Sequence, residues 1–212
     1  MLYKVFNRKR KIFAFWCMAL SLMLLIVWFI RIISVNTNAF HQTTEIYNTD
    51  EMVNLDGNFF FDSNEDTKGY FIKVNKAILK DYKKYLNSYG EKVEEDPEFP
   101  TPKYVCLINV TIKNENNSNG YLNTLGFSLF DRALQIPIDY EVWNLIDESI
   151  DGNTSLKLRK NSEVTLDLPF VAQSLDEDLN SKELNDRLEN NTFQFFICDF
   201  PIRKLINVKF TK

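Results

Sequence analysis

The feature that most constrains this chain is a run of 19 residues without a charge, from Ile12 to Ile30. A helix rises about 1.5 Å per residue, so an apolar run of this length spans the roughly 30 Å of hydrocarbon in a bilayer. Five basic residues precede the run, and Arg31 follows it. Because positive residues stay on the cytoplasmic side of a membrane, we expect the N-terminus inside and the rest of the chain outside.

This run divides the sequence into four predicted parts. They are a cytoplasmic basic segment over residues 1–11, a transmembrane signal anchor over 12–33, a stalk over 34–68 and an extracellular domain over 69–212. The stalk prediction rests on a polar composition with few apolar positions. A cleaved signal peptide is the alternative, because Thr37 and Ala39 fit its cleavage positions, but signal peptides usually have an apolar core of only about 7 to 15 residues.

The part beyond the apolar run is strongly acidic. All 29 acidic residues follow residue 33, together with 19 of the 25 basic ones, which gives this part a net charge of about −10. Such a surface repels nucleic-acid phosphates and anionic polymers, so we expect no nucleic-acid partner. A basic protein or peptide fits better, although a negative charge also serves simply to keep a domain soluble.

Most of the predicted extracellular domain follows the period of two that marks half-buried strands. The clearest strand is Lys103 to Lys113, in which alternate residues from Tyr104 to Ile112 form one apolar face. Further strands are expected at 70–79, 125–130 with 134–138, 156–158 with 164–170, 193–200 and 202–210. Short strands separated by turn residues favour a mainly β fold, an immunoglobulin-like antiparallel β-sandwich behind one transmembrane helix.

Two segments interrupt this series of strands. Residues 81–102 are polar and contain three prolines, which predicts a long loop with a helical turn near Asp81 to Leu86. Asn180 with Glu183 resembles a helix cap, and Leu184 and Leu188 then share one face of a helix. We expect this helix to be short and superficial.

The sequence offers little catalytic chemistry. Its single histidine, His41, falls in the predicted stalk, so no histidine is available inside the domain for a nucleophile pair or a multi-histidine zinc site. Cys106 and Cys198, the two cysteines beyond the anchor, are either a disulfide or two buried thiols. We predict no catalytic residue, no cofactor and no enzymatic activity.

One acidic loop resembles the start of a calcium-binding loop. Asp62, Asn64 and Asp66 alternate in the way that oxygen ligands do in such loops. The sixth position is Thr67 rather than Gly, and the twelfth is Lys73 rather than a bidentate Glu. An acidic loop without calcium is therefore the better interpretation, and no metal ligand is predicted.

Three segments resemble a known family. They are Tyr104 to Asn119, a long strand that ends in a Lys-Asn turn; Leu125 to Ile138, a Phe-x-Leu-x-Asp hairpin; and Leu158 to Ala172, a turn that leads into a strand. These segments are similar to an extracellular immunoglobulin-like domain of unknown function on Gram-positive lipoproteins and single-pass surface proteins, related in fold to a mycobacterial secreted immunogenic antigen. The resemblance implies an immunoglobulin-like sandwich and no catalytic residue. The turn near Asn161 lacks the family's usual Pro-Gly, and the acidic segment 175–191 has no counterpart.

Two functions fit these observations. The first is a non-enzymatic domain on the cell membrane that binds a protein or peptide through its loops or a sheet edge. The second is an accessory or immunity protein of a membrane complex such as an exporter, in which the apolar helix is the binding element.

Overall fold

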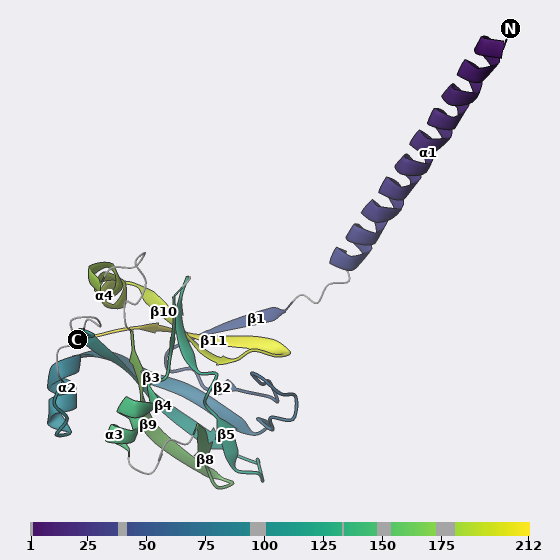
Figure 1. The fold of residues 1–212 in the computed structure, drawn as a ribbon. Helices are drawn as coiled ribbons and strands as arrows, with labels where there is room; N and C mark the ends of the chain where they lie inside the picture. Colours follow the sequence, from purple (N-terminus) through teal and green to yellow (C-terminus); the bar gives the residue numbers. More distant parts are fainter. Residues whose placement is uncertain (1, 38–41, 94–100, 133, 148–153, 173–180) are drawn as a thin grey trace. The chain divides into compact units, whose positions relative to one another are not determined.

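The computed structural model describes residues 2–37, 42–93, 101–132, 134–147, 154–172 and 181–212 (Figure 1). The chain divides into two compact units, Met1–His41 and Gln42–Lys212. The first contains helix α1 (Leu2–Thr37), and within it Phe13–Thr37 is long and apolar enough to cross a membrane. The predicted apolar helix is therefore present, and it extends four residues beyond the predicted end of the anchor at residue 33.

The second unit is mainly β, as the sequence predicts. A five-stranded sheet has the order β1-β11-β10-β6-β7 and a four-stranded sheet the order β2-β3-β4-β9, while β5 and β8 form a separate pair. The strands are β1 (Thr43–Asn48), β2 (Val53–Asn54), β3 (Tyr70–Asp81), β4 (Tyr104–Asn114), β5 (Tyr121–Asn123), β6 (Ser128–Asp131), β7 (Leu134–Pro137), β8 (Ser155–Lys157), β9 (Ser162–Val171), β10 (Thr192–Cys198) and β11 (Ile202–Lys209). The described part of this unit also contains the short helices α2 (Tyr82–Ser88), α3 (Tyr140–Ile146) and α4 (Ser181–Asn190).

Strand β4 is the centre of the four-stranded sheet, between β3 and β9. Its predicted apolar face is confirmed: Cys106, Ile108, Val110 and Ile112 all lie in the main core. The opposite face is also covered near the start of the strand, where residues including Leu107 pack with side chains of α2 and α3. A strand segment buried on both faces is expected to be apolar at every position, and Tyr104–Ile108 is, whereas the opposite face further along β4 carries Asn109, Thr111 and Lys113.

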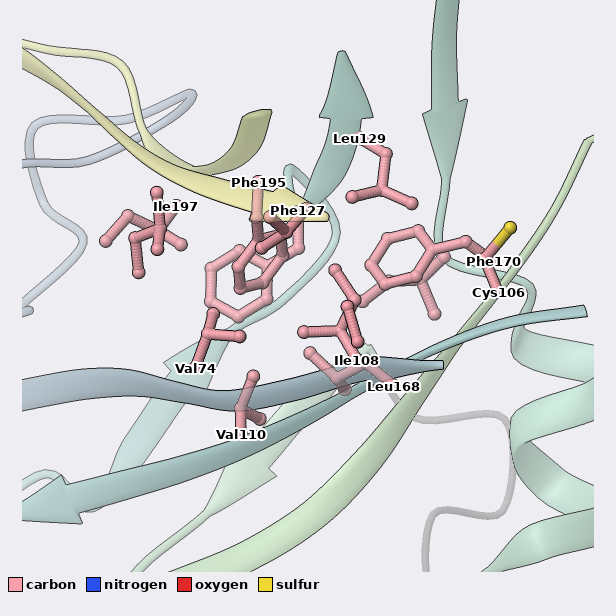
Figure 2. Close-up of a cluster of buried hydrophobic side chains, with 14 of the residues drawn as sticks. Val74, Cys106, Ile108, Val110, Phe127, Leu129, Leu168, Phe170, Phe195 and Ile197 are labelled. Carbon is pink, nitrogen blue, oxygen red and sulfur yellow. The ribbon is translucent and has the colours of Figure 1, made fainter. Parts of the chain in front are cut away.

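The main core lies between the two large sheets (Figure 2). Phe195 of β10 is fully buried and makes edge-on contacts with the rings of Phe127 and Phe170, at centroid distances of 5.4 and 5.9 Å. Aromatic pairs of this geometry contribute about 0.5–1.5 kcal/mol each beyond the burial of their area. This aromatic group joins side chains of both sheets and so holds them together.

The predicted stalk is wrong for the residues that the structure describes from Thr43 onward. Strand β1 pairs in parallel with β11 along its whole length, and β2 pairs with β3. Val53 and Leu55 are each 1% exposed and belong to the main core. The β domain therefore begins close to residue 42, and its β1–β11 pairing is parallel within sheets that are otherwise antiparallel.

The helices depart from the sequence predictions in two ways. Helix α4 is present where Leu184 and Leu188 predict it, but these residues are only 3% and 2% exposed and lie in the core, so the helix is not superficial. The predicted cap residue Asn180 lies outside the described residues. Helix α3 was not predicted, although its Trp143 is 1% exposed. Helix α2 confirms the predicted turn after Asp81, whose side chain accepts a hydrogen bond from the backbone N–H of Lys84 at 2.9 Å.

The position of the domain boundary can be tested with two fragments. We expect residues 42–212 to unfold cooperatively on heating and residues 69–212 to show no such transition, because the shorter fragment lacks β1, β2 and two core residues. Within the longer fragment, Leu55→Ala should lower the free energy of unfolding by about 2–5 kcal/mol, the usual cost of a large-to-small change in a core. Circular dichroism against temperature and urea measures both effects, and equal stability of the two fragments would contradict the boundary.

Candidate functional site

The five-stranded sheet has an apolar face that points away from the core. We call it the outer face and define it by Ile46, Phe130, Gln194, Phe196, Arg203 and Leu205. Ile46 pairs with Leu205 across β1 and β11, and Leu205 pairs with Phe196 across β11 and β10, so the three form one row over three strands. Their chain neighbours Phe195 and Ile206 point into the core, as the period of two requires.

A hollow on this outer face is lined by aromatic, amide and guanidinium groups. Five of the outer-face residues surround it, all except Ile46, and its volume is about 180 Å³. The Arg203 guanidinium carbon lies 5.5 Å from the centroid of the Phe196 ring, and the Phe130 ring meets the same ring edge-on at 5.5 Å. Arg203 Nε also donates a hydrogen bond to Asp199 at 2.9 Å, which fixes the guanidinium. Aromatic and arginine side chains of this kind are those most enriched at protein-binding surfaces.

The segment that follows β2 borders this hollow. The Phe60 ring packs edge-on against Phe196 with a centroid distance of 5.0 Å. The ring lies directly over Gly126, where a Cβ atom would come within 2.3 Å of it, so only glycine admits this contact. Phe61, the next residue, is 64% exposed. The border of the outer face thus presents a large apolar side chain to solvent.

Strand β1 is a free edge of the same sheet. Among the described residues it pairs with β11 only, and it contains neither proline nor lysine, two residues that commonly protect sheet edges. Ile46, in its middle, is 54% exposed. Apart from the N–H of Asn48, which donates to the Glu51 carboxylate at 3.2 Å, this six-residue edge strand offers backbone N–H and C=O groups to an incoming strand.

Buried polar contacts hold β1 in place. Lys204 of β11 is 5% exposed, donates a hydrogen bond to the backbone oxygen of Asn54 at 2.7 Å and lies 3.5 Å from the carboxylate of Glu45. Tyr47 donates a hydrogen bond to the same carboxylate at 2.6 Å. Burial, with a smaller contribution from Glu45, raises the pKa of Tyr47 to about 12, so its hydroxyl stays protonated and can donate. The edge is therefore free but well anchored.

A second polar cluster joins α4 to the end of the chain. The Glu189 carboxylate accepts hydrogen bonds from Lys212 at 2.7 Å, Tyr104 at 2.5 Å and Lys103 at 3.1 Å. The ammonium groups of Lys103 and Lys212 also lie 4.6 and 5.8 Å from the centre of the Tyr104 ring. These donors, Lys212 first, lower the pKa of Glu189 from 4.5 to about 2. The cluster links three distant parts of the sequence, and we assign it a structural role.

The calcium-like loop uses its oxygen atoms internally. Asp62 accepts hydrogen bonds from both the backbone and the side chain of Asn64, at 2.9 Å each. Asp66 accepts a hydrogen bond from the side chain of Asn119 at 3.0 Å. In the described part of the chain, no three His, Cys, Asp or Glu side chains come together as a metal site would require.

The two cysteines of the domain are free thiols. Cys106 and Cys198 are 0% and 1% exposed. Burial raises the pKa of Cys198 to about 12 and that of Cys106 well above its ordinary range. Of the two alternatives left open by the sequence, the structure has the buried thiols. His41 lies outside the described residues.

No site residue is predicted from the sequence, and the outer face is missing from the sequence-based expectations. Strand β10 contains one sequence pattern that indicates the outer face. Phe193 and Phe195 lie on one face of the strand and Phe196 lies on the other, so both faces carry an aromatic residue. In a sheet with one solvent face, the outward positions are usually polar. An aromatic residue at such a position indicates that something else covers that face.

The fold and the outer face together describe a class of protein: a mainly β domain of about 170 residues that follows an apolar helix in the chain and has an apolar sheet face away from its core, on which Ile46 is exposed and Phe196 and Leu205 are each 8% exposed. The chain belongs to the family described as domain of unknown function DUF5028, whose model matches residues 44–204. This match begins within β1. The chain also resembles the solved structure of the YjhA protein from Bacillus subtilis, at 13% identity and a TM-score of 0.39, over 77% of this chain and 99% of that one. No curated protein matches the chain.

The Glu189 cluster predicts a specific dependence of stability on pH. Because the pKa of Glu189 in the folded protein lies below its ordinary value, its stabilising effect is complete above pH 4.5 and is lost as the pH falls toward 2. Glu189→Gln should lower the melting temperature at neutral pH and reduce its decline between pH 4.5 and 2.

The matched control is Glu115→Gln, which removes one ion pair with Lys113, both of whose side chains are about 40% exposed. Exposed ion pairs contribute little, so this variant should follow the parent protein across the pH range. Differential scanning fluorimetry from pH 2 to pH 7 measures all three proteins. Parallel curves for the parent and Glu189→Gln would contradict the role of Glu189.

Proposed function

We propose that this chain is a single-pass membrane protein of a Gram-positive cell surface, whose β domain binds an extended segment of another protein outside the cell. The observation that carries this proposal is the position of the outer-face hollow beside the free edge of β1. Ile46 belongs to both features, because it lies on the edge strand and in the same row as Leu205 and Phe196. An extended peptide paired with β1 would therefore place alternate side chains along the outer face.

The charge of the domain favours a basic partner. Beyond residue 33 the acidic residues outnumber the basic ones by 29 to 19. Glu45 on β1 and Glu51 just after it add negative charge at this edge of the sheet, although Glu45 also pairs with Lys204 and Glu51 accepts hydrogen bonds from Asn48. The occupant of the outer face is thus an extended segment that combines apolar and basic side chains.

A membrane anchor with the N-terminus inside is part of the same proposal. Support comes from the helix Phe13–Thr37 and from the five basic residues that precede residue 12, which favour retention on the cytoplasmic side. We also propose that the two large sheets form an immunoglobulin-like sandwich. Its support is that both sheets contribute to one core and that all their pairings except β1–β11 are antiparallel.

We propose a binding role without catalysis. A thiolate nucleophile needs a lowered pKa and an accessible position, whereas Cys106 and Cys198 are buried and have raised pKa values. The carboxylates of Asp62 and Asp66 already accept hydrogen bonds within their loop and across to Asn119.

The accessory function in a membrane complex is the second candidate. It is favoured by the length of α1 and by its long apolar stretch, since the segment Phe13–Thr37 is long and apolar enough to cross a membrane. In that case the helix, and not the β domain, would recognise the partner.

The proposed topology predicts which part of the chain a protease reaches. Protease added to intact cells should degrade the β domain and leave a fragment that contains α1. An epitope tag placed before residue 2 should survive this treatment and become sensitive only after the membrane is permeabilised. Survival of the β domain on intact cells would contradict an extracellular position.

The proposed binding surface predicts a position-dependent cross-link. A photo-reactive amino acid in place of Ile46, in the full-length chain on native cells, should give one defined adduct with a partner protein. Mass spectrometry should locate the adduct in an extended basic segment of that partner. The further change Arg203→Ala should reduce its yield several-fold, because it removes a side chain that lines the hollow and packs on the Phe196 ring.

Two controls make this experiment decisive. The same reactive group at Leu125, which is 52% exposed in the turn after β5, should not give the adduct. Replacement of residues 12–30 by an unrelated apolar helix should leave the cross-link intact if the domain binds, and abolish it if the helix is the binding element. Equal adducts from both positions would overturn the outer-face assignment.

A further inference from the structure

A polar hollow of about 340 Å³ lies at the end of the domain where β5 and β8 pair. Its wall is formed by the loop after β2 and by strands β5 and β8, and none of its residues belongs to the outer face. The side chains that matter here are Asn64, Asp66, Asn119, Tyr121 and Asn123. This volume lies at the lower end of the range of small-molecule sites in proteins.

Two buried asparagines hold the wall of this hollow in place. Asn117 is 3% exposed, and its side chain donates hydrogen bonds to the backbone oxygens of Asp66 at 2.7 Å and Lys68 at 3.1 Å. Its own oxygen accepts from the backbone N–H of Gly120 at 3.0 Å. Asn114 is fully buried and donates to the backbone oxygens of Asn117 and Leu158, both at 3.0 Å. A buried polar network in which every hydrogen bond is formed is rigid. The residues that line the hollow are therefore fixed in position before a ligand binds.

The turn that presents Tyr121 is equally constrained. Gly120 has a φ of +71°, and a Cβ atom there would lie 2.9 Å from the backbone oxygen of Leu158. Only glycine satisfies both conditions at low cost. The backbone conformation of Gly120 therefore fixes the direction of the chain at the next residue, Tyr121. Tyr121 is 53% exposed.

The hollow combines an exposed aromatic ring with side-chain amides. Asn64 and Asn119 each use one amide hydrogen within the wall, on Asp62 and Asp66, so each retains a second hydrogen and an oxygen. An exposed tyrosine offers a flat apolar face and a polar hydroxyl. Sugars present the complementary chemistry, because a pyranose ring has an apolar face of C–H groups and a rim of hydroxyls that both donate and accept.

The charges at the hollow select among sugars. Glu65 and Asp66 line it, and among the residues that the structure describes no lysine or arginine does. Lys157 is close, with its ammonium 5.4 Å from the centre of the Tyr121 ring, on one face of that ring. An anionic ligand would meet two carboxylates, which disfavours sugar acids and phosphorylated sugars. A neutral ligand meets no such penalty.

We propose that this hollow is a binding site for a neutral oligosaccharide, with Tyr121 as the stacking platform and Asn64, Asn119 and Asn123 as hydrogen-bonding groups. The site is separate from the outer face and does not depend on the protein-binding function proposed above. It gives the domain a second ligand class, a surface glycan.

Titration calorimetry on the full-length protein tests this proposal, with a detergent that has no sugar headgroup. The probes are chitotriose and maltotriose, two neutral trisaccharides, and trigalacturonic acid as an anionic comparison. We expect at least one neutral probe to bind with a millimolar or lower Kd and the anionic one to bind at least tenfold more weakly. Binding of neither neutral probe, or tighter binding of the anionic one, overturns the proposal.

Variants locate the binding on the protein. Tyr121→Ala should weaken binding of the neutral probe at least tenfold, and Asn119→Ala should weaken its binding several-fold. Tyr89→Ala is the matched control, because Tyr89 is another exposed tyrosine, at 44%, on a different part of the surface beside α2. Melting temperatures establish that each variant is folded. Unchanged binding in a folded Tyr121→Ala variant, or an equal loss in Tyr89→Ala, also overturns the proposal.

Discussion

The packing of two sheets around Phe195 is the constraint on which the rest of this domain depends. Its ring contacts Phe127 and Phe170, and so ties the five-stranded sheet to the four-stranded one. Once Phe195 faces the core, the period of two turns Phe196 to the other side of the sheet. On that side the Phe196 ring is only 8% exposed, because Phe60, Phe130 and Arg203 pack against it. The apolar outer face is thus a direct consequence of how the core is built.

Much of the fold was predictable because its longest strands carry strong local signals. Strands β3, β4, β9, β10 and β11 alternate or are continuously apolar, and each was expected near its observed position. Leu184 and Leu188 likewise predicted α4 from their spacing. The spacing did not predict how deeply these two leucines are buried, because their burial depends on the sheet against which the helix packs.

The missed elements share a physical cause. Strand β1 is polar and pairs with β11, about 160 residues away, so nothing within its own segment marks it as a strand. Strand β2 has two residues, too few to show a period, and α3 has only seven. The outer face was missed for the same reason, because Ile46, Phe196 and Leu205 become neighbours only after three strands pair. Local patterns predict local structure, whereas a binding surface is made by long-range pairing.

The parallel pairing of β1 with β11 puts the strand that follows the apolar helix in sequence at the edge of the five-stranded sheet. Strand β1 follows the apolar helix in the chain and is also the free edge of the sheet. It is held by six paired residues and by Lys204, whose buried ammonium bonds to the backbone at Asn54 and lies beside Glu45. A partner strand added to β1 would place this strand between two neighbours and satisfy the backbone groups of its open edge. In the proposed binding mode, pairing at this edge would therefore strengthen the strand through which any pull on the apolar helix enters the domain.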